Sequence, residues 1–475
     1  MNAILLSVIL GVVMMFSSIF VQNKKAFRYI ATAGLFILLA GCFADFNGII
    51  LWNIDTKGVL VFDNFGSYFN IIAVAVTLVY VLLTGKEIQQ TGSYIAEYFA
   101  LIFFVMCGIF LLSSYNNLLM LFLGIEILSI PLYILTGSDK RNMKSNEASL
   151  KYFLMGTFST GLLLMGIAFI YGATGSFSLE VLHTQPPVAN VQASESTVSF
   201  LEIVGMLFLM VAIGFKVSAA PFHFWTPDVY DGAPTVFTSF MATIVKAAGF
   251  IAFIKLFDAR MMETSVENNK VIGVDWKLLF AILIVCTLLV GNITAVFQQS
   301  VKRMLAYSSI AQAGFMLFAL FSMNDAAKEG ILMYTIAYSL ATIGIFAILV
   351  KLKDFTYEGF NGLGKTQPAL AFANTVFLLS LAGIPLTAGF FAKFFMLESV
   401  VKTGSYLWLV IVAVVFAAIS AYYYFRVIQA MYFKTGDGET IEAPAVGFKI
   451  GIVILALAII YLGIFPQTLF GLFYF

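Results

Sequence analysis

The chain has 475 residues, of which 61% are hydrophobic and only 11% are charged, and its formal net charge is +1. A soluble domain carries about 25% charged residues, so this composition excludes an ordinary soluble protein. The near-neutral charge also argues against nucleic acid as a partner.

Runs of about 20 apolar residues recur along the whole chain, and each is long enough to cross a hydrocarbon core of about 30 Å. We therefore predict an all-α integral membrane protein with about fourteen membrane-spanning helices and no soluble domain between them. In chain order, the expected spans are 3–21, 27–46, 60–84, 94–113, 116–136, 147–172, 199–220, 234–257, 274–297, 301–322, 328–352, 369–400, 405–433 and 446–472.

The basic residues are distributed unequally between the two sets of loops that these spans define. Loops after odd-numbered spans hold most of the lysines and arginines, for example Lys24, Lys140 and Lys434, whereas the alternate loops hold few. Cytoplasmic loops of membrane proteins carry the excess of positive charge. The pattern supports the span count and predicts that both termini lie on the outer side of the membrane. We expect the first span to be retained rather than cleaved, because no basic residue precedes it.

Among the charged residues inside the expected spans, one glutamate and three lysines stand out because they interrupt long apolar runs: Glu126, Lys216, Lys246 and Lys393. An ionisable group at the bilayer centre costs about 2.5–3.5 kcal/mol on insertion scales. A lysine near a span end, such as Lys151 or Lys255, can extend its ammonium group to the membrane interface. Lys246 cannot, because it lies about twelve residues, or about 18 Å, from either end of its span. We interpret the four residues as a proton path.

Small polar residues recur at helical spacing beside these charges. Three expected helices carry such stripes: Thr235, Ser239, Thr243 and Lys246; Glu126, Ser129 and Tyr133; and Ser308 and Gln312. A single hydroxyl is explained by a hydrogen bond to its own helix or to a neighbouring one. A stripe that ends on a buried charge favours the lining of a water-accessible path.

Two expected spans contain helix breakers at mid-course. The seventh is interrupted at Ser218-Ala219-Ala220-Pro221, with His223 just beyond, and the twelfth is interrupted between Gly383 and Gly389, around Pro385. Proline removes a backbone donor, and non-helical backbone at membrane depth must be satisfied by protein or water. Broken helices at matching places indicate inverted repeats.

We therefore expect two inverted five-helix repeats, spans four to eight and nine to thirteen, with helices 7 and 12 broken. The predicted organisation is a three-helix N-terminal segment, a first repeat, a second repeat and a C-terminal helix, at 1–93, 94–257, 274–433 and 446–475.

Four segments resemble the antiporter-like membrane subunits of respiratory complex I: LGIEILSIPLYIL, GFKVSAAPFHFWTPDVYDGAPTVFTSFMATIVKAAGF, KRMLAYSSIAQAGF and PLTAGFFAKFF. The resemblance runs from about Ala96 to Lys434, and PFHFWTPDVYDGAP is its most specific part. The family has a glutamate on span five, lysines on spans seven and eight, and a lysine or glutamate on span twelve. Glu126, Lys216, Lys246 and Lys393 occupy these places.

The resemblance implies a proton-translocating, multi-pass subunit of the bacterial inner membrane, with periplasmic termini and no cofactor of its own. FMN, iron–sulfur clusters and quinone are then expected in partner subunits, and neighbouring antiporter-like and small membrane subunits are the expected contacts. The resemblance also implies that Glu126 pairs with Lys216 and that protons pass through Lys246 to Lys393 on the exit side. Many relatives carry histidine in place of Gln312, and an amide cannot titrate near neutral pH.

Other functions stay open on the sequence alone. A subunit of a multi-subunit Na⁺/H⁺ antiporter would share the fold and most of the charges, and a stand-alone solute carrier could use the broken helices. A metal or cluster site is not expected, because the cysteines are isolated and only His183 and His223 are present. The segment 359–366 matches a phosphate-loop pattern but lies in a short loop without the strand that such a loop follows.

Overall fold

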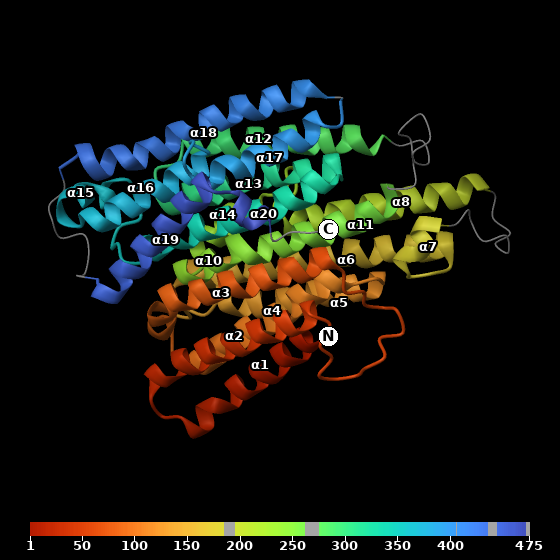
Figure 1. Cartoon of the computed structure of the whole chain (residues 1–475), viewed down its shortest axis with the longest axis horizontal. Coiled ribbons are helices and arrows are strands. Elements are labelled where there is room, and N and C mark those ends of the chain that lie inside the picture. The colour runs from red at the N-terminus through yellow and green to blue at the C-terminus, as the bar shows by residue number, and fades with distance from the viewer. Residues whose placement is uncertain (185–194, 262–274, 405, 436–443, 472–475) are drawn as a thin grey trace.

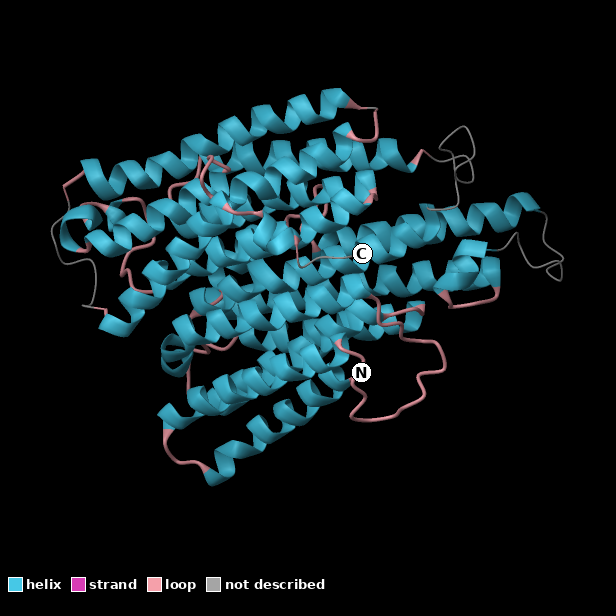
Figure 2. Cartoon of the chain, in the orientation of Figure 1, coloured by secondary structure: helices cyan, strands magenta, loops and turns pink. Residues whose placement is uncertain are grey.

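The computed structural model describes residues 1–184, 195–261, 275–404, 406–435 and 444–471. The described part is built from helices joined mostly by short loops, and it contains no β-strand (Figure 2). The first helices lie along one edge of the bundle and α18 lies along the opposite edge (Figure 1).

The first half of the chain forms α1 to α8, with bounds Asn2–Phe20, Lys24–Phe46, Asn64–Thr91, Ile95–Ser114, Leu118–Thr136, Met143–Thr174, Leu179–Thr184 and Glu195–Lys216. Several of these helices begin after an asparagine or aspartate whose side chain accepts from the first turn, as Asp63 does from the Gly66 amide at 2.6 Å. Such caps satisfy amides that have no partner inside the helix.

The rest of the chain forms α9 to α20 and the short helices η1 and η2. Their bounds are Trp225–Gly232 (α9), Thr235–Phe240 (α10), Met241–Val245 (η1), Lys246–Met261 (α11), Trp276–Val296 (α12), Val301–Ser322 (α13), Asp325–Leu349 (α14), Glu358–Phe360 (η2), Leu363–Thr366 (α15), Pro368–Ala382 (α16), Ala388–Val401 (α17), Leu407–Phe433 (α18), Val446–Ile464 (α19) and Gln467–Phe470 (α20).

Each expected span coincides with a helix or with a broken helix, so the all-α membrane fold is confirmed. Twelve of the described helical segments are long and apolar enough to cross a bilayer, and α16 is a shorter apolar helix. The total of fourteen spans and the inverted relation between the repeats stay predictions. The short helix α7 in the connection near 173–198 was not expected.

Both predicted breaks are present. Helix α8 ends at Lys216, and the chain turns through Ser218 at a φ of +64° before α9 begins. Helix α16 ends at Ala382, and Gly383 at a φ of +83° leads to α17. At the first break, the Trp225 indole N–H donates to the Phe215 carbonyl at 2.9 Å, which satisfies an acceptor at the helix end.

The eighth span contains an irregularity that the sequence does not predict. A five-residue π-helical segment, η1, separates α10 from α11, and Lys246 is the first residue after it. Single π turns inside α-helices are rare and are often found at functional sites.

The most buried helices lie in the middle of the bundle. Helices α13 and α14 and the α10–η1–α11 span are buried over almost their whole length, whereas α1, α2, α18 and α19 expose most of theirs. The central helices are therefore shielded from lipid, which is where an ionisable side chain costs least to retain.

Candidate functional site

The Lys216 side chain, at the end of α8, is held by the polar stripe of α5. Its Nζ donates to Ser129 Oγ at 2.8 Å and to Tyr133 OH at 3.3 Å, and it lies 5.6 Å from the centre of the Tyr133 ring. Ser129 in turn donates to the Ile125 carbonyl of its own helix. The structure thus brings together three of the predicted site residues.

Glu126 lies on the same helix, three residues before Ser129, and therefore on the same face. Its Oε1 atom is buried and has no hydrogen-bond partner. The Lys216 ammonium binds hydroxyls rather than this carboxylate, so no ion pair joins the two described side chains in this conformation. A buried carboxylate oxygen without a partner is costly. The Glu126–Lys216 ion pair therefore stays a prediction. Glu126 is one helical turn from Ser129, whose hydroxyl accepts from the Lys216 ammonium.

Lys246 is buried at the centre of the bundle, with 2% of its surface exposed. Its Nζ donates to both the carbonyl and the hydroxyl of Ser309 on α13, each at 3.0 Å. It also lies 5.7 Å from the centre of the Tyr230 ring on α9. A desolvated contact of this kind attracts an ammonium by about 2 kcal/mol. Among the described side chains, Lys246 has no carboxylate at ion-pair distance.

Lys393, on α17, binds the end of the helix on the other side of its own break. Its Nζ donates to the Leu381 carbonyl at 2.8 Å and to the Ala382 carbonyl at 3.0 Å. These carbonyls end α16, where backbone acceptors lack partners and the helix dipole is negative. The break at 383–387 therefore creates the site in which the ammonium lies.

Polar groups of α13 extend from Lys246 toward Lys393. Next to Ser309, the Ser308 hydroxyl is hydrogen-bonded to Tyr424, and Tyr424 accepts from Gln312 Nε2 at 3.2 Å. The same Gln312 nitrogen donates to the Leu381 carbonyl at 2.9 Å. Hydrogen bonds therefore link Ser308 through Tyr424 and Gln312 to the Leu381 carbonyl. The step from Ser309, which binds Lys246, to Ser308 is between neighbouring side chains and is not bridged by one of these bonds.

A tyrosine completes the surroundings of Gln312. Tyr334 of α14 donates to the Gln312 amide oxygen. A small cavity beside Gln312, Tyr334 and Lys393 has room for about one water molecule. The sequence signalled Gln312 but neither Tyr334 nor Tyr424, because both come from helices distant in the chain.

The remaining predicted residues lie around the two breaks or in the eighth span, and they are not bonded to the three ammonium groups. Ser218 accepts from the Thr226 hydroxyl at 2.8 Å, and Thr243 donates to the Ser239 carbonyl of its own span at 2.8 Å. Two buried atoms, Ser239 Oγ and His223 Nδ1, have no hydrogen-bond partner. The two prolines, Pro221 and Pro385, are exposed. Thr243 thus follows the simpler explanation of a bond within its own helix.

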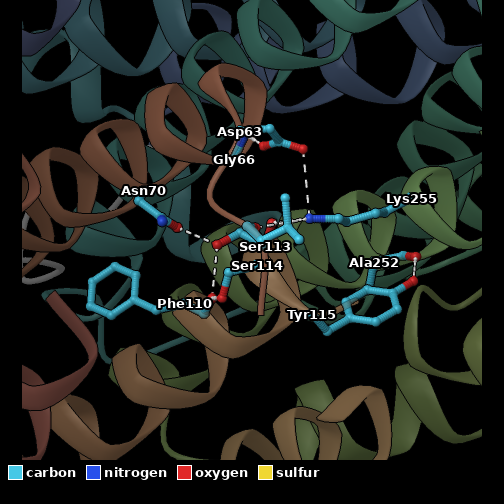
Figure 3. Close-up of polar contacts among 10 residues, drawn as sticks. Asp63, Gly66, Asn70, Phe110, Ser113, Ser114, Tyr115, Ala252 and Lys255 are labelled. Carbon is cyan, nitrogen blue, oxygen red and sulfur yellow. Dashed lines mark hydrogen bonds and ion pairs between the residues drawn. The ribbon is translucent and has the colours of Figure 1, made fainter. Parts of the chain in front are cut away.

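Two basic residues differ from their expected positions. Lys302, at the start of the expected span 301–322, counts with the basic residues of the cytoplasmic side, yet it is only 3% exposed and donates to the carbonyls of Asp231 at 2.8 Å and Ala233 at 2.7 Å. Lys255 was expected to reach the membrane interface, but its ammonium turns into the protein. It donates to the Ser113 carbonyl at 3.0 Å and lies 3.6 Å from an Asp63 carboxylate oxygen (Figure 3). Neither residue carries a sequence signal for these contacts.

Within the described ranges, no group of three or more histidine, cysteine, aspartate or glutamate side chains could hold a metal ion. The groups that the arrangement does bring together are hydroxyls, an amide, ammonium groups and the Glu126 carboxylate, all of which can bind or pass on a proton or a water molecule.

Comparisons with known proteins agree on one family. The family described as "NADH:quinone oxidoreductase/Mrp antiporter, TM" matches residues 115–420. The NADH-quinone oxidoreductase subunit N of Cytophaga hutchinsonii is 40% identical over 99% of this chain and 98% of its own length.

Two solved structures share the fold. A chain in the structure of respiratory complex I from Thermus thermophilus with bound aureothin is 29% identical, with a TM-score of 0.81, over 98% of this chain and 97% of that one. A chain of the Mrp complex from Dietzia sp. DQ12-45-1b has the same TM-score over 98% of this chain and 94% of that one, but it is only 18% identical. The second likeness concerns the fold alone.

Proposed function

The chain belongs to the NADH:quinone oxidoreductase/Mrp antiporter membrane family, and we infer from this premise that it is a proton-translocating membrane subunit of an NADH:quinone oxidoreductase. It works together with other membrane and antiporter-like subunits of that complex. The Na⁺/H⁺ antiporter alternative rests on a shared fold at 18% identity, whereas the subunit N relative is 40% identical along almost the whole chain.

We propose that Glu126, Lys216, Lys246 and Lys393 carry the proton and that the chain takes no part in electron transfer. FMN, iron–sulfur clusters and quinone then belong to partner subunits. The observation that supports this most directly is the run of polar groups on α13 between two buried ammonium groups, from Ser309 to the Leu381 carbonyl.

In the proposed cycle, the Lys216 ammonium moves between the hydroxyl of Ser129 and the carboxylate of Glu126. An opposite charge nearby favours the charged form of a lysine, so moving away from Glu126 releases the proton. The proton passes through water to Lys246 and then along α13 to Lys393, on the exit side. Moving each proton against 100 mV costs about 2.3 kcal/mol, which quinone reduction in the partner subunits supplies.

The distribution of lysine and arginine supports an orientation in which both termini face the periplasm. The same rule places the cluster of charged side chains at Lys151 and Arg303 on the cytoplasmic side.

The test is the complex carrying Lys246→Ala, reconstituted in liposomes, with proton uptake and NADH oxidation measured together. We expect proton uptake per NADH oxidised to fall while the subunit remains assembled. The matched control is Lys402→Ala, because Lys402 is an exposed lysine paired with Glu398 at 3.0 Å. Unchanged proton uptake in the Lys246 variant would rule out the proposed path, and uptake that requires Na⁺ would favour the antiporter alternative.

A further inference from the structure

Helix α9 lies in the chain between Lys216 and Lys246, the two site lysines of the first expected repeat, yet it has only eight residues. Helices shorter than about 12–15 residues are marginal by themselves, so contacts with other helices must fix its position. One end carries Trp225, whose indole binds the carbonyl of Phe215, the neighbour of Lys216. Further along is Tyr230, whose buried ring faces the Lys246 ammonium.

Asp228 fastens this helix to two others. Its Oδ2 accepts from Lys151 of α6 at 2.9 Å, and its Oδ1 accepts from Arg303 of α13 at 2.9 Å. The two carboxylate oxygens therefore hold α9 to one helix from each expected repeat. Lys151 has a second partner, the Glu147 carboxylate at 2.7 Å, which lies on α6 and does not bind α9.

The surroundings of Asp228 are charged and open to water. A cavity of about 230 Å³ is lined by Lys144, Glu147, Lys151, Asp228, Asp231 and Arg303. Burial alone would raise the pKa of Asp228, but the hydrogen bonds from Lys151 and Arg303 lower it below its ordinary value. Asp228 is therefore ionised at neutral pH.

Close packing strengthens the dependence of α9 on these contacts. A Cβ atom at Gly232 would lie 2.6 Å from the Lys144 carbonyl, so the end of α9 lies directly against α6. Asp228 and Tyr230 are two residues apart, and side chains at that spacing point to opposite sides of a helix. One therefore faces the charged cavity while the other faces Lys246.

We propose that Asp228 is a positioning residue for proton transfer, which fixes α9 between α6 and α13 and so holds the Tyr230 ring against the Lys246 ammonium. This rests on the proposed function of Lys246. Because the three paired side chains are each more than a third exposed, the ion pairs contribute little to stability. The role of these two ion pairs is instead to fix the position of α9 between α6 and α13.

The experiment compares Asp228→Asn, Asp228→Glu and Glu147→Gln in the assembled complex, reconstituted in liposomes. Asp228→Asn should lower proton uptake per NADH about tenfold, since misplacing a reacting group by about 1 Å can cost up to about a hundredfold. Asp228→Glu keeps both ion pairs and should restore most of the uptake. Glu147→Gln removes a partner of the same lysine without touching α9 and should leave uptake near the wild-type value.

A second comparison separates positioning from a general loss of structure. If Asp228 acts through Tyr230, then Asp228→Asn combined with Tyr230→Leu should be no worse than Tyr230→Leu alone. Effects that multiply, or normal uptake in Asp228→Asn, would overturn the proposal. If Asp228→Asn does not assemble, Lys151→Met and Arg303→Gln each remove one partner, and normal uptake in both would overturn it equally.

Lys246→Ala in the same preparation keeps the two proposals distinct. Loss of uptake in Lys246→Ala with none in Asp228→Asn would refute the positioning role alone. Normal uptake in Lys246→Ala would refute the proton path itself.

Discussion

Lys393 and Gln312 donate to the same backbone oxygen, that of Leu381, at 2.8 Å and 2.9 Å respectively. The last titratable group of the proposed path thus meets the polar groups of α13 at a carbonyl beside a helix break. A carbonyl oxygen has two lone pairs and can accept both bonds at once, so the Gln312 amide keeps this oxygen hydrogen-bonded if the Lys393 ammonium moves away.

We therefore expect Gln312→Leu to lower proton uptake per NADH severalfold, since it leaves Tyr334 and Tyr424 without their amide partner. Gln312→His should retain uptake, because imidazole can both donate and accept. Proton uptake at equal assembly is the measurement. Full uptake in the leucine variant would show that the polar groups of α13 are not needed.

Glu126→Gln should lower proton uptake about tenfold, the effect of about 1.4 kcal/mol on a barrier, because an amide cannot change the charge state of Lys216. Glu126→Asp keeps the charge on a shorter side chain and should be milder. Both variants are measured in liposomes at matched subunit content. Equal uptake in the two would mean that Glu126 only joins helices.

Lys302→Met should destabilise the chain by about 1–3 kcal/mol, because it leaves the buried carbonyls of Asp231 and Ala233 without a donor. Lys302→Arg keeps a donor and should cost less. Thermal unfolding of the purified complex, followed by loss of this subunit, measures the difference. A methionine variant as stable as wild type would contradict the contact.

The Asp228 contacts should weaken in acid. Because the pKa of the folded Asp228 lies below its ordinary value of 3.8, its stabilising contribution is complete above that value. It is lost as the pH falls through the lowered pKa. The wild-type complex should therefore lose slightly more thermal stability than Asp228→Asn as the pH falls below 3.8, and the difference should be small because the ion pairs are partly exposed. Parallel losses in the two proteins would show that the carboxylate is not paired in solution.

The spans, the two breaks and the four membrane-embedded ionisable residues could be predicted because each is marked locally. An apolar run, a proline at mid-span and a lysine among apolar residues are visible without knowing what lies nearby. The unpredicted features depend on contacts between distant helices. No residue near Lys302 in the sequence indicates that its ammonium binds the Ala233 carbonyl at the end of α9. Likewise, no residue near Tyr424 indicates its hydrogen bond with Ser308. The π turn before Lys246 also has no local marker.

The atoms that accept hydrogen bonds from Lys393 have a consequence for how the sequence can evolve. Both acceptors are main-chain oxygens, of Leu381 and Ala382, so a change of side chain at either position leaves the same oxygen in place. Residues 381 and 382 can therefore change during evolution without removing the two acceptors, and sequence conservation at these positions would not reveal the Lys393 site. What selection must preserve instead is the place where the helix stops, and Gly383, at a φ of +83°, is the residue whose replacement would disturb it.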